Sequence, residues 1–405
     1  MNLGMLREDR LVGRAWLVSR LVMAVICFSV VYPARPVLGD VGIYDEWSDL
    51  LIEGTFPADD VRWQYPPLAA LPMLIPRLLG PLYGLGFAFL VVAADYAVMR
   101  VLVRKGESPE GAWCWVGGIF LLGPVCFFRF DTLVVVPVVF ALLMVARSRL
   151  FGALVAVGAL MKVWPALLFL ALCRGRAAIG AAAAFLVAAA GLAGVIALVA
   201  DDEWSFLKGQ RDRGIEIEAL VATPFHVARW FGWSGDVRYQ YGSWELTGAG
   251  VPAAVNVSVV ITLVGLAAVA LAVLRRPARD WSPARGADAV LAGLLAAIAG
   301  SRVLSPQYLV WVVGVAAVCL TMRRTRQRPA VAVLLAAIAL TQLEFPILWQ
   351  GVRDGQAFPA SVLILRNVLV LVATVLAVVA VWRDGGEARD DPSVTERRPR
   401  PAGTG

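Results

Sequence analysis

The chain has 405 residues, of which 60% are hydrophobic and 17% are charged, and its mean hydropathy is +0.73. A water-soluble domain cannot cover that much apolar surface, so we expect lipid to be the solvent for most of the chain. The formal net charge of +7 does not indicate a nucleic-acid partner, because the arginines stand at the ends of apolar segments rather than in one patch.

Metal and redox chemistry are not indicated by the sequence. The five cysteines fall within or beside apolar segments and form no C-x-x-C pair, so we interpret them as buried thiols that pack as small hydrophobes. His226 is the sole histidine, and no D-x-D motif lies in the loops. The sequence therefore predicts no metal site and no cofactor.

The first apolar segment follows Arg7, Arg10 and Arg14 and covers residues 17–31. A secretory signal begins in a similar way, but no small-residue cleavage site follows this segment, and many more apolar spans do. We therefore expect a first membrane helix. The arginines before it place the N-terminus in the cytoplasm.

Residues 34–64 are expected to form a large outer loop. Acidic residues crowd the stretch "GDVGIYDEWSDLLIEG" (39–54), and tyrosine and tryptophan are interleaved with them, as suits a sugar or lipid-headgroup platform. The next stretch, "PPLAALPMLIPRLLG" (66–80), is short, rich in proline and contains Arg77. It is predicted to be a juxtamembrane or re-entrant helix, so that residues 34–80 make up the first outer region.

The rest of the chain alternates apolar spans with basic connectors. Residues 150–172 are interrupted by Lys162 and Pro165 and have basic residues at both ends, which predicts a hairpin of two short helices with "MKVWP" at its tip. Residues 201–249 are expected to form the second large outer loop. Further spans are expected near residues 82–103, 112–127, 132–146, 177–200, 251–273, 287–300, 308–321, 329–345 and 359–382.

These segments predict an all-α polytopic membrane protein. About ten full transmembrane helices and the short hairpin would form the bundle, with both termini in the cytoplasm and both large loops outside. Residues 1–383 are expected to be one integral membrane domain. Residues 384–405 are polar and rich in proline and glycine, which predicts a disordered cytoplasmic tail.

Four stretches resemble, in their order along the chain, glycosyltransferase family 87, a polytopic family within the GT-C superfamily. They are "GDVGIYDEW" followed by "QYPPLAALP", "ALMKVWPALL" (159–168), "RDRGIEIEAL" (211–220) and "SRVLSPQYLVW" (301–311). The family shows a Lys-x-x-Pro turn, an Arg-Gly-x-x-x-Glu stretch and a Ser-Pro-Gln-Tyr stretch in these places. The resemblance implies a GT-C-like bundle in the cytoplasmic membrane, with its active site on the outer side.

The resemblance also implies a reaction. An inverting transferase of this kind moves mannose from a polyprenyl-phosphate donor to a lipid-linked glycan acceptor. One carboxylate must take the proton of the acceptor hydroxyl, and cations must stabilise the charge that builds on the lipid phosphate. Asp40 matches the loop aspartate of the family and is the expected base, with Asp45 as the alternative.

The expected substrate-binding residues come from several segments. Arg302, at an outer helix start in "SRVLSP", is the first candidate for the donor phosphate, and Arg213 is the second. Lys162 lies in an apolar hairpin, where a lysine costs roughly 2.5–3.5 kcal/mol to insert, so it is expected to serve either the lipid phosphate or the structure. Glu218 and His226 are expected on the acceptor side. The expected set also includes Tyr65, Gln307 and Tyr308.

A polytopic lipid or sugar transporter, or a flippase, is the alternative function. Transporters often carry inverted repeats with paired broken helices, but "YPPL" and "KVWP" each occur once, and the acid-rich loops lie on one expected side. A non-catalytic scaffold would not need acids grouped beside a re-entrant helix. The transferred sugar stays open between mannose, arabinose and other polyprenyl-linked sugars.

Overall fold

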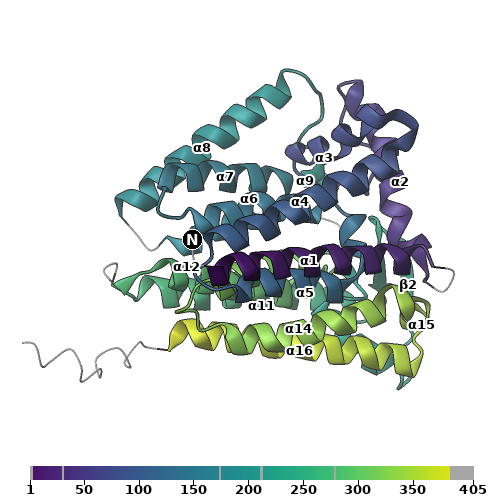
Figure 1. The fold of residues 1–405 in the computed structure, drawn as a ribbon. Coiled ribbons are helices and arrows are strands. Elements are labelled where there is room, and N and C mark those ends of the chain that lie inside the picture. The colour runs from purple at the N-terminus through teal and green to yellow at the C-terminus, as the bar shows by residue number, and fades with distance from the viewer. Residues whose placement is uncertain (1–2, 30–31, 173–174, 210–212, 278–279, 384–405) are drawn as a thin grey trace, which may run out of the picture.

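The computed structural model describes residues 3–29, 32–172, 175–209, 213–277 and 280–383. Helices run side by side in one bundle from α1 (Leu3–Cys27) to α16 (Ala357–Trp382) (Figure 1). α1 begins and α16 ends at the same end of the bundle, at the left of the view, and the strands lie at the opposite end. The expected tail, residues 384–405, lies outside the described residues.

Within the residues that the structure describes, six stretches are long and apolar enough to cross a membrane. They are Pro67–Lys105, which ends in α4 (Tyr83–Lys105), α8 (Arg176–Ala197), α11 (Val251–Leu274), α12 (Pro283–Gly300), Arg328–Ile347, which begins with α14 (Arg328–Gln342), and α16. The protein is thus a mostly helical membrane protein, as the sequence predicts. The expected ten crossings and their orientation stay predictions.

Shorter apolar helices fill the interior of the bundle. They are α5 (Glu110–Leu122), α6 (Asp131–Leu143), α7 (Ser148–Met161) and α13 (Tyr308–Thr321). α13 packs against α5 and α6 and is buried along most of its length. By contrast, α8 and α11 leave most of their apolar side chains exposed, because lipid rather than protein covers the outside of such a bundle.

A buried ion pair joins α1 to α4. The carboxylate of Asp95 accepts hydrogen bonds from Nε and Nη2 of Arg20, both at 2.8 Å, and from the indole N–H groups of Trp16 and Trp115, at 2.7 and 2.8 Å. A charge pair inside a membrane protein is tolerated when its hydrogen-bonding groups find partners. This cluster therefore fixes α1 against α4 and α5.

Much of the first expected outer loop is helical, which corrects the prediction for residues 34–52. These residues form α2 (Ala34–Ile52), and its buried side chains recur every three or four residues, which places them on one helix face. They are Val37, Val41, Tyr44, Trp47, Ser48 and Leu51. The exposed acids Asp45 and Asp49 lie between them and obscure that periodicity in the sequence.

Residues 66–80, the segment predicted to be a juxtamembrane or re-entrant helix, form short helices. η1 (Pro67–Ala69), α3 (Ala70–Leu74) and η2 (Ile75–Leu82) run on into α4, with a kink at Gly80, whose φ is 53°. The guanidinium of Arg77 contacts Asp45 and Asp49 of α2. Residues 66–80 and α2 are therefore linked by ion pairs.

The second expected outer loop contains a small sheet, which the all-α prediction missed. β1 (Ile215–Glu216), β2 (Asp236–Gln240) and β3 (Ser243–Thr247) form an antiparallel sheet in the order β1-β3-β2. Tyr241 and Gly242, with φ values of 51° and 77°, make the two-residue turn that suits a tight hairpin. The region also contains α9 (Phe206–Gly209), η5 (Leu220–Ala222) and α10 (Thr223–Arg229).

The predicted hairpin at residues 150–172 corresponds to α7 and η4 (Trp164–Ala171), with Lys162 and Val163 between them. A proline at the second position of η4 cannot continue the hydrogen bonding of a preceding helix, which explains the break. The remaining short elements join longer helices: η3 (Pro124–Phe127), η7 (Leu343–Ile347) and α15 (Trp349–Arg353).

Candidate active site

A cavity of about 440 Å³ opens at the sheet end of the bundle. Its walls are α2, the segment before η1, the break between α7 and η4, the β2–β3 hairpin, and the turn that joins α12 to α13. These walls come from segments far apart in the sequence. The residues expected from the sequence that line the cavity are Asp40, Tyr65, Lys162, Arg213, Arg302, Gln307 and Tyr308.

Asp40 lies on α2 with a third of its side chain exposed. Its Oδ2 atom is 2.7 Å from Nε of Arg129, and the side chains are 33% and 6% exposed. Arg129 belongs to the corner "FFRFDTL" between η3 and α6. Nothing in the sequence indicates that Arg129 pairs with Asp40, because only the fold brings the two residues close.

Lys162 is enclosed by charge and by aromatic rings. Its Nζ donates to Oδ1 of Asp131 at 2.7 Å, and the same oxygen accepts the indole N–H of Trp311 at 2.6 Å. The ammonium lies 4.9 to 5.3 Å from four ring centroids, close enough for cation–π attraction. Those rings belong to Tyr65, Phe130, Tyr308 and Trp311. The cost of burying this lysine is therefore offset within the protein.

Three aromatic rings are stacked along one wall of the cavity. The ring of Trp311 lies between those of Trp164 and Tyr308, at centroid distances of 5.3 and 4.0 Å and interplanar angles of 19° and 20°. All three residues line the cavity. A stack of this kind offers a flat apolar surface beside polar groups, which suits a sugar ring with its alternating C–H and O–H faces.

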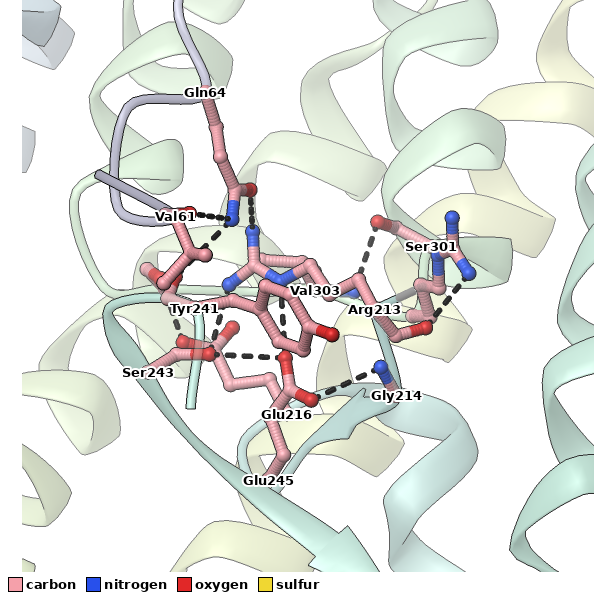
Figure 2. Close-up of polar contacts among 12 residues, drawn as sticks. Val61, Gln64, Arg213, Gly214, Glu216, Tyr241, Ser243, Glu245, Ser301 and Val303 are labelled. Atoms are coloured by element: carbon pink, nitrogen blue, oxygen red, sulfur yellow. Dashed lines mark hydrogen bonds and ion pairs between the residues drawn. The ribbon is translucent and has the colours of Figure 1, made fainter. Parts of the chain in front are cut away.

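Arg213 joins the two outer regions (Figure 2). It donates to Oε1 of Gln64 at 2.6 Å, to Oγ of Ser243 at 2.8 Å and to Oε1 of Glu245 at 3.1 Å. Gln64 in turn donates to the carbonyl of Tyr241 at the hairpin tip, at 3.2 Å. Each of the three guanidinium nitrogens of Arg213 thus donates to a protein acceptor. Arg213 therefore cross-links two walls of the cavity.

Arg302 lies on the turn between α12 and α13, and β1 holds that turn in place. Its Nη1 donates to the carbonyl of Arg213 at 2.8 Å, and its own carbonyl accepts the backbone N–H of Glu216 at 2.9 Å. The Glu216 carboxylate accepts the N–H of Leu304 at 2.7 Å and the hydroxyl of Ser305 at 2.8 Å. Burial raises the pKa of Glu216. Sequence reasoning missed this glutamate, although it stands inside "RDRGIEIEAL".

Three of the expected site residues, Asp45, Glu218 and His226, do not line the cavity. Asp45 contacts Arg77, at 3.1 Å. Glu218 is buried against Arg366 of α16, and Nε2 of His226 is 2.6 Å from the Ile217 carbonyl. Burial raises the pKa of Glu218 and lowers that of His226. These two side chains support β1 from the side of the bundle.

The site supplies groups for acid–base and electrostatic chemistry. A partly exposed carboxylate, cationic side chains and an aromatic wall meet in one cavity. Within the described part of the chain, no group of three or more His, Cys, Asp and Glu side chains is placed to hold a metal ion. The fold and the cavity together define a helical membrane protein with a polar cavity between its helices and its sheet.

The model of glycosyltransferase family 87 matches residues 63–306, which is more than half of the chain, and the chain belongs to this family. It is therefore a glycosyltransferase, which uses a sugar donor and an acceptor. The match includes Lys162, Arg213 and Arg302, whereas Asp40 precedes it and Tyr308 follows it. A comparison of the chain with curated proteins found no match.

Proposed function

We propose that the protein transfers mannose, or a related sugar, from a polyprenyl-phosphate donor to a lipid-linked glycan acceptor on the outer side of the cytoplasmic membrane. One observation carries the proposal: the carboxylate of Asp40 and the side chain of Arg302 line the same cavity. Membership of the family supports the transfer of a sugar. The identities of the sugar, of the donor lipid and of the acceptor are our proposal.

The proposed reaction is a single displacement with inversion. The acceptor hydroxyl oxygen attacks C1 of the sugar, and the bond from C1 to the phosphate oxygen breaks. Asp40 takes the hydroxyl proton, because a general base must lie within hydrogen-bond reach of the proton that it removes. Polyprenyl phosphate leaves with the bonding electrons, and Arg302 stabilises the negative charge on it. The two other candidate cations are assigned to structure: Arg213 to the cross-link between the walls and Lys162 to its pair with Asp131.

Two apolar side chains support a lipid-linked donor. Val163 and Leu207 both line the cavity, and they are 63% and 60% exposed. In a membrane protein, an exposed apolar rim offers a path for a lipid chain. We expect Val163→Arg to raise the KM of a long-chain polyprenyl-phosphate sugar. The KM of a short-chain, water-soluble donor would stay at the wild-type value.

The decisive test measures transfer of radiolabelled mannose from synthetic donor in proteoliposomes that contain envelope glycolipids. Asp40→Asn is expected to lower kcat by about 10²–10⁴-fold, the usual contribution of a general base, while the protein still inserts and binds donor. Glu53→Gln is the matched control, because Glu53 is exposed, caps the end of α2 and does not line the cavity. Near-wild-type turnover of Asp40→Asn would contradict the assignment, and a loss confined to Asp45→Asn would move the base there.

A further inference from the structure

Arg129 contacts α2 at two points. Its Nη1 donates to the carbonyl of Val37 at 2.8 Å, and its Nε lies 2.7 Å from Oδ2 of Asp40. Val37 and Asp40 are three residues apart in α2, so they lie on the same helix face. One guanidinium therefore hydrogen-bonds a backbone carbonyl of α2 and forms an ion pair with the carboxylate one turn further on, and it links the corner to the start of α2 and to Asp40.

The start of α2 has little local support of its own. The residue before the helix is Pro33, and no side chain caps its first turn by a hydrogen bond. Helix ends without such caps fray easily. A long-range contact such as that of Arg129 is what restrains Asp40 in position, because Asp40 lies only six residues from the start of the helix at Ala34.

The corner that carries Arg129 is itself held in place. Arg129 donates to the carbonyl of its neighbour Phe128 at 2.9 Å. Two residues further, Asp131 accepts from Lys162 at 2.7 Å and from Trp311 at 2.6 Å. The corner thus reaches α2 on one side and the opposite wall of the cavity on the other. It sets the distance from the Asp40 carboxylate to the cations and rings of that wall.

Arg129 does not reach the substrate space. It is 5% exposed and does not line the cavity. Its Nη1 donates to a carbonyl of α2 and to a carbonyl of its own corner, and its Nε lies against Asp40 in an ion pair. Lysine could not replace these contacts, because an ammonium is a point charge without the planar fork of a guanidinium. The chemistry of Arg129 is therefore that of a positioning residue rather than of a substrate ligand.

We propose that Arg129 is a positioning residue that holds the Asp40 carboxylate toward the acceptor hydroxyl in the cavity. The inference rests on the proposed function, since Asp40 must be the base. Proton transfer needs the two oxygens within about 2.6–3.2 Å, and a displacement of about 1 Å costs about 10²-fold in rate. Loss of Arg129 would therefore lower kcat. It would leave donor binding intact, because Arg129 itself does not line the cavity.

The test compares kcat and the donor KM of Arg129→Gln and Arg129→Lys with those of the wild type, in the proteoliposome assay. Arg129→Gln is expected to lower kcat by about 10²-fold and to leave KM within about threefold. Arg129→Lys keeps the charge but loses the planar guanidinium, so its kcat is expected to lie between those of the wild type and Arg129→Gln. If Arg129→Gln is not recovered folded, Arg129→Lys decides: a reduced kcat at unchanged KM supports the proposal, and wild-type kcat overturns it.

Arg20→Gln is the matched control, because it breaks another buried arginine–aspartate pair, that with Asp95. It is expected to lower the thermal midpoint and to leave kcat of the folded fraction unchanged. A wild-type kcat in Arg129→Gln, or equal losses of kcat in both arginine variants, would overturn the positioning role. If Asp40→Asn also kept wild-type turnover, the proposed base itself would fail. If Asp40→Asn were inactive and Arg129→Gln fully active, the positioning role of Arg129 would be wrong and the assignment of Asp40 as the base would stand.

Discussion

The carboxylate of Glu216 in β1 accepts the backbone N–H of Leu304, 88 residues further along the chain, at 2.7 Å. Its other oxygen accepts the hydroxyl of Ser305 at 2.8 Å. The three-stranded sheet thereby holds the turn that presents Arg302 and Gln307 to the cavity. The family match covers the sheet and ends within that turn, at residue 306.

We predict that Glu216→Ala impairs the use of donor. Without the carboxylate, the N–H of Leu304 and the hydroxyl of Ser305 lose a buried acceptor, which costs about 1–3 kcal/mol for each group left unpaired. The turn would loosen, and the donor KM would rise because Arg302 is no longer held at the cavity. Glu216→Gln keeps one acceptor oxygen and is expected to lie closer to the wild type. Unchanged donor KM in Glu216→Ala would show that the turn holds its shape alone.

A second prediction concerns the pair of Lys162 and Asp131. Lys162→Met leaves the Asp131 carboxylate buried without its cation, and breaking a buried pair in this way costs about 3–5 kcal/mol. Asp131→Asn still offers Trp311 an oxygen acceptor. The double variant, which carries both changes, is therefore expected to be more stable than Lys162→Met alone. Thermal or denaturant unfolding of the four proteins gives the coupling energy. Additive losses would mean that the pair is not coupled.

The sequence predicts those parts of the site that depend on neighbouring residues, and it does not predict contacts between residues far apart in the chain. The break at Lys162 and Val163 was predictable, because a lysine and a proline interrupt an apolar run. α2 was predictable in principle from the spacing of Val37, Val41 and Tyr44, but the acids between them favoured a loop. The pairing of Asp40 with Arg129 leaves no local signal, since 89 residues separate them and only tertiary packing of α2 on the corner brings them together.

The buried acid Glu218 predicts a pH dependence of stability. Burial raises its pKa, with the nearby Glu344 as the next cause. Its contribution to stability is fully present below the unfolded pKa of about 4.3 and is lost as the pH rises through the folded pKa. We expect the thermal midpoint of the wild type to fall as the pH rises from 5 to 9, and that of Glu218→Gln to fall less.

Comparing the wild type with Glu218→Gln separates the effect of Glu218 on the thermal midpoint from that of His226. Burial lowers the pKa of His226, so its contribution is lost as the pH falls below its unfolded value of about 6.5, which is the opposite sense. Both proteins keep His226, so the difference between their midpoints reports on Glu218. Glu53→Gln, at an exposed position, should follow the wild type. Parallel curves for the wild type and Glu218→Gln would contradict the prediction.

The close contact of α7 with α8 predicts that one added methyl group at Gly152 strongly lowers stability. A Cβ at Gly152 of α7 would lie 2.0 Å from the carbonyl oxygen of Ala181 in α8, so the backbones touch as small residues allow in membrane helices. Gly152→Ala must push α8 away and is expected to cost about 1–3 kcal/mol, as overpacking does. Gly191→Ala, in α8 with no atom within 4 Å of the added Cβ, is the matched control. Thermal unfolding in detergent compares them. Equal midpoints for both variants would mean that α8 moves freely against α7, and that this lipid-exposed helix does not support the hairpin that carries Lys162.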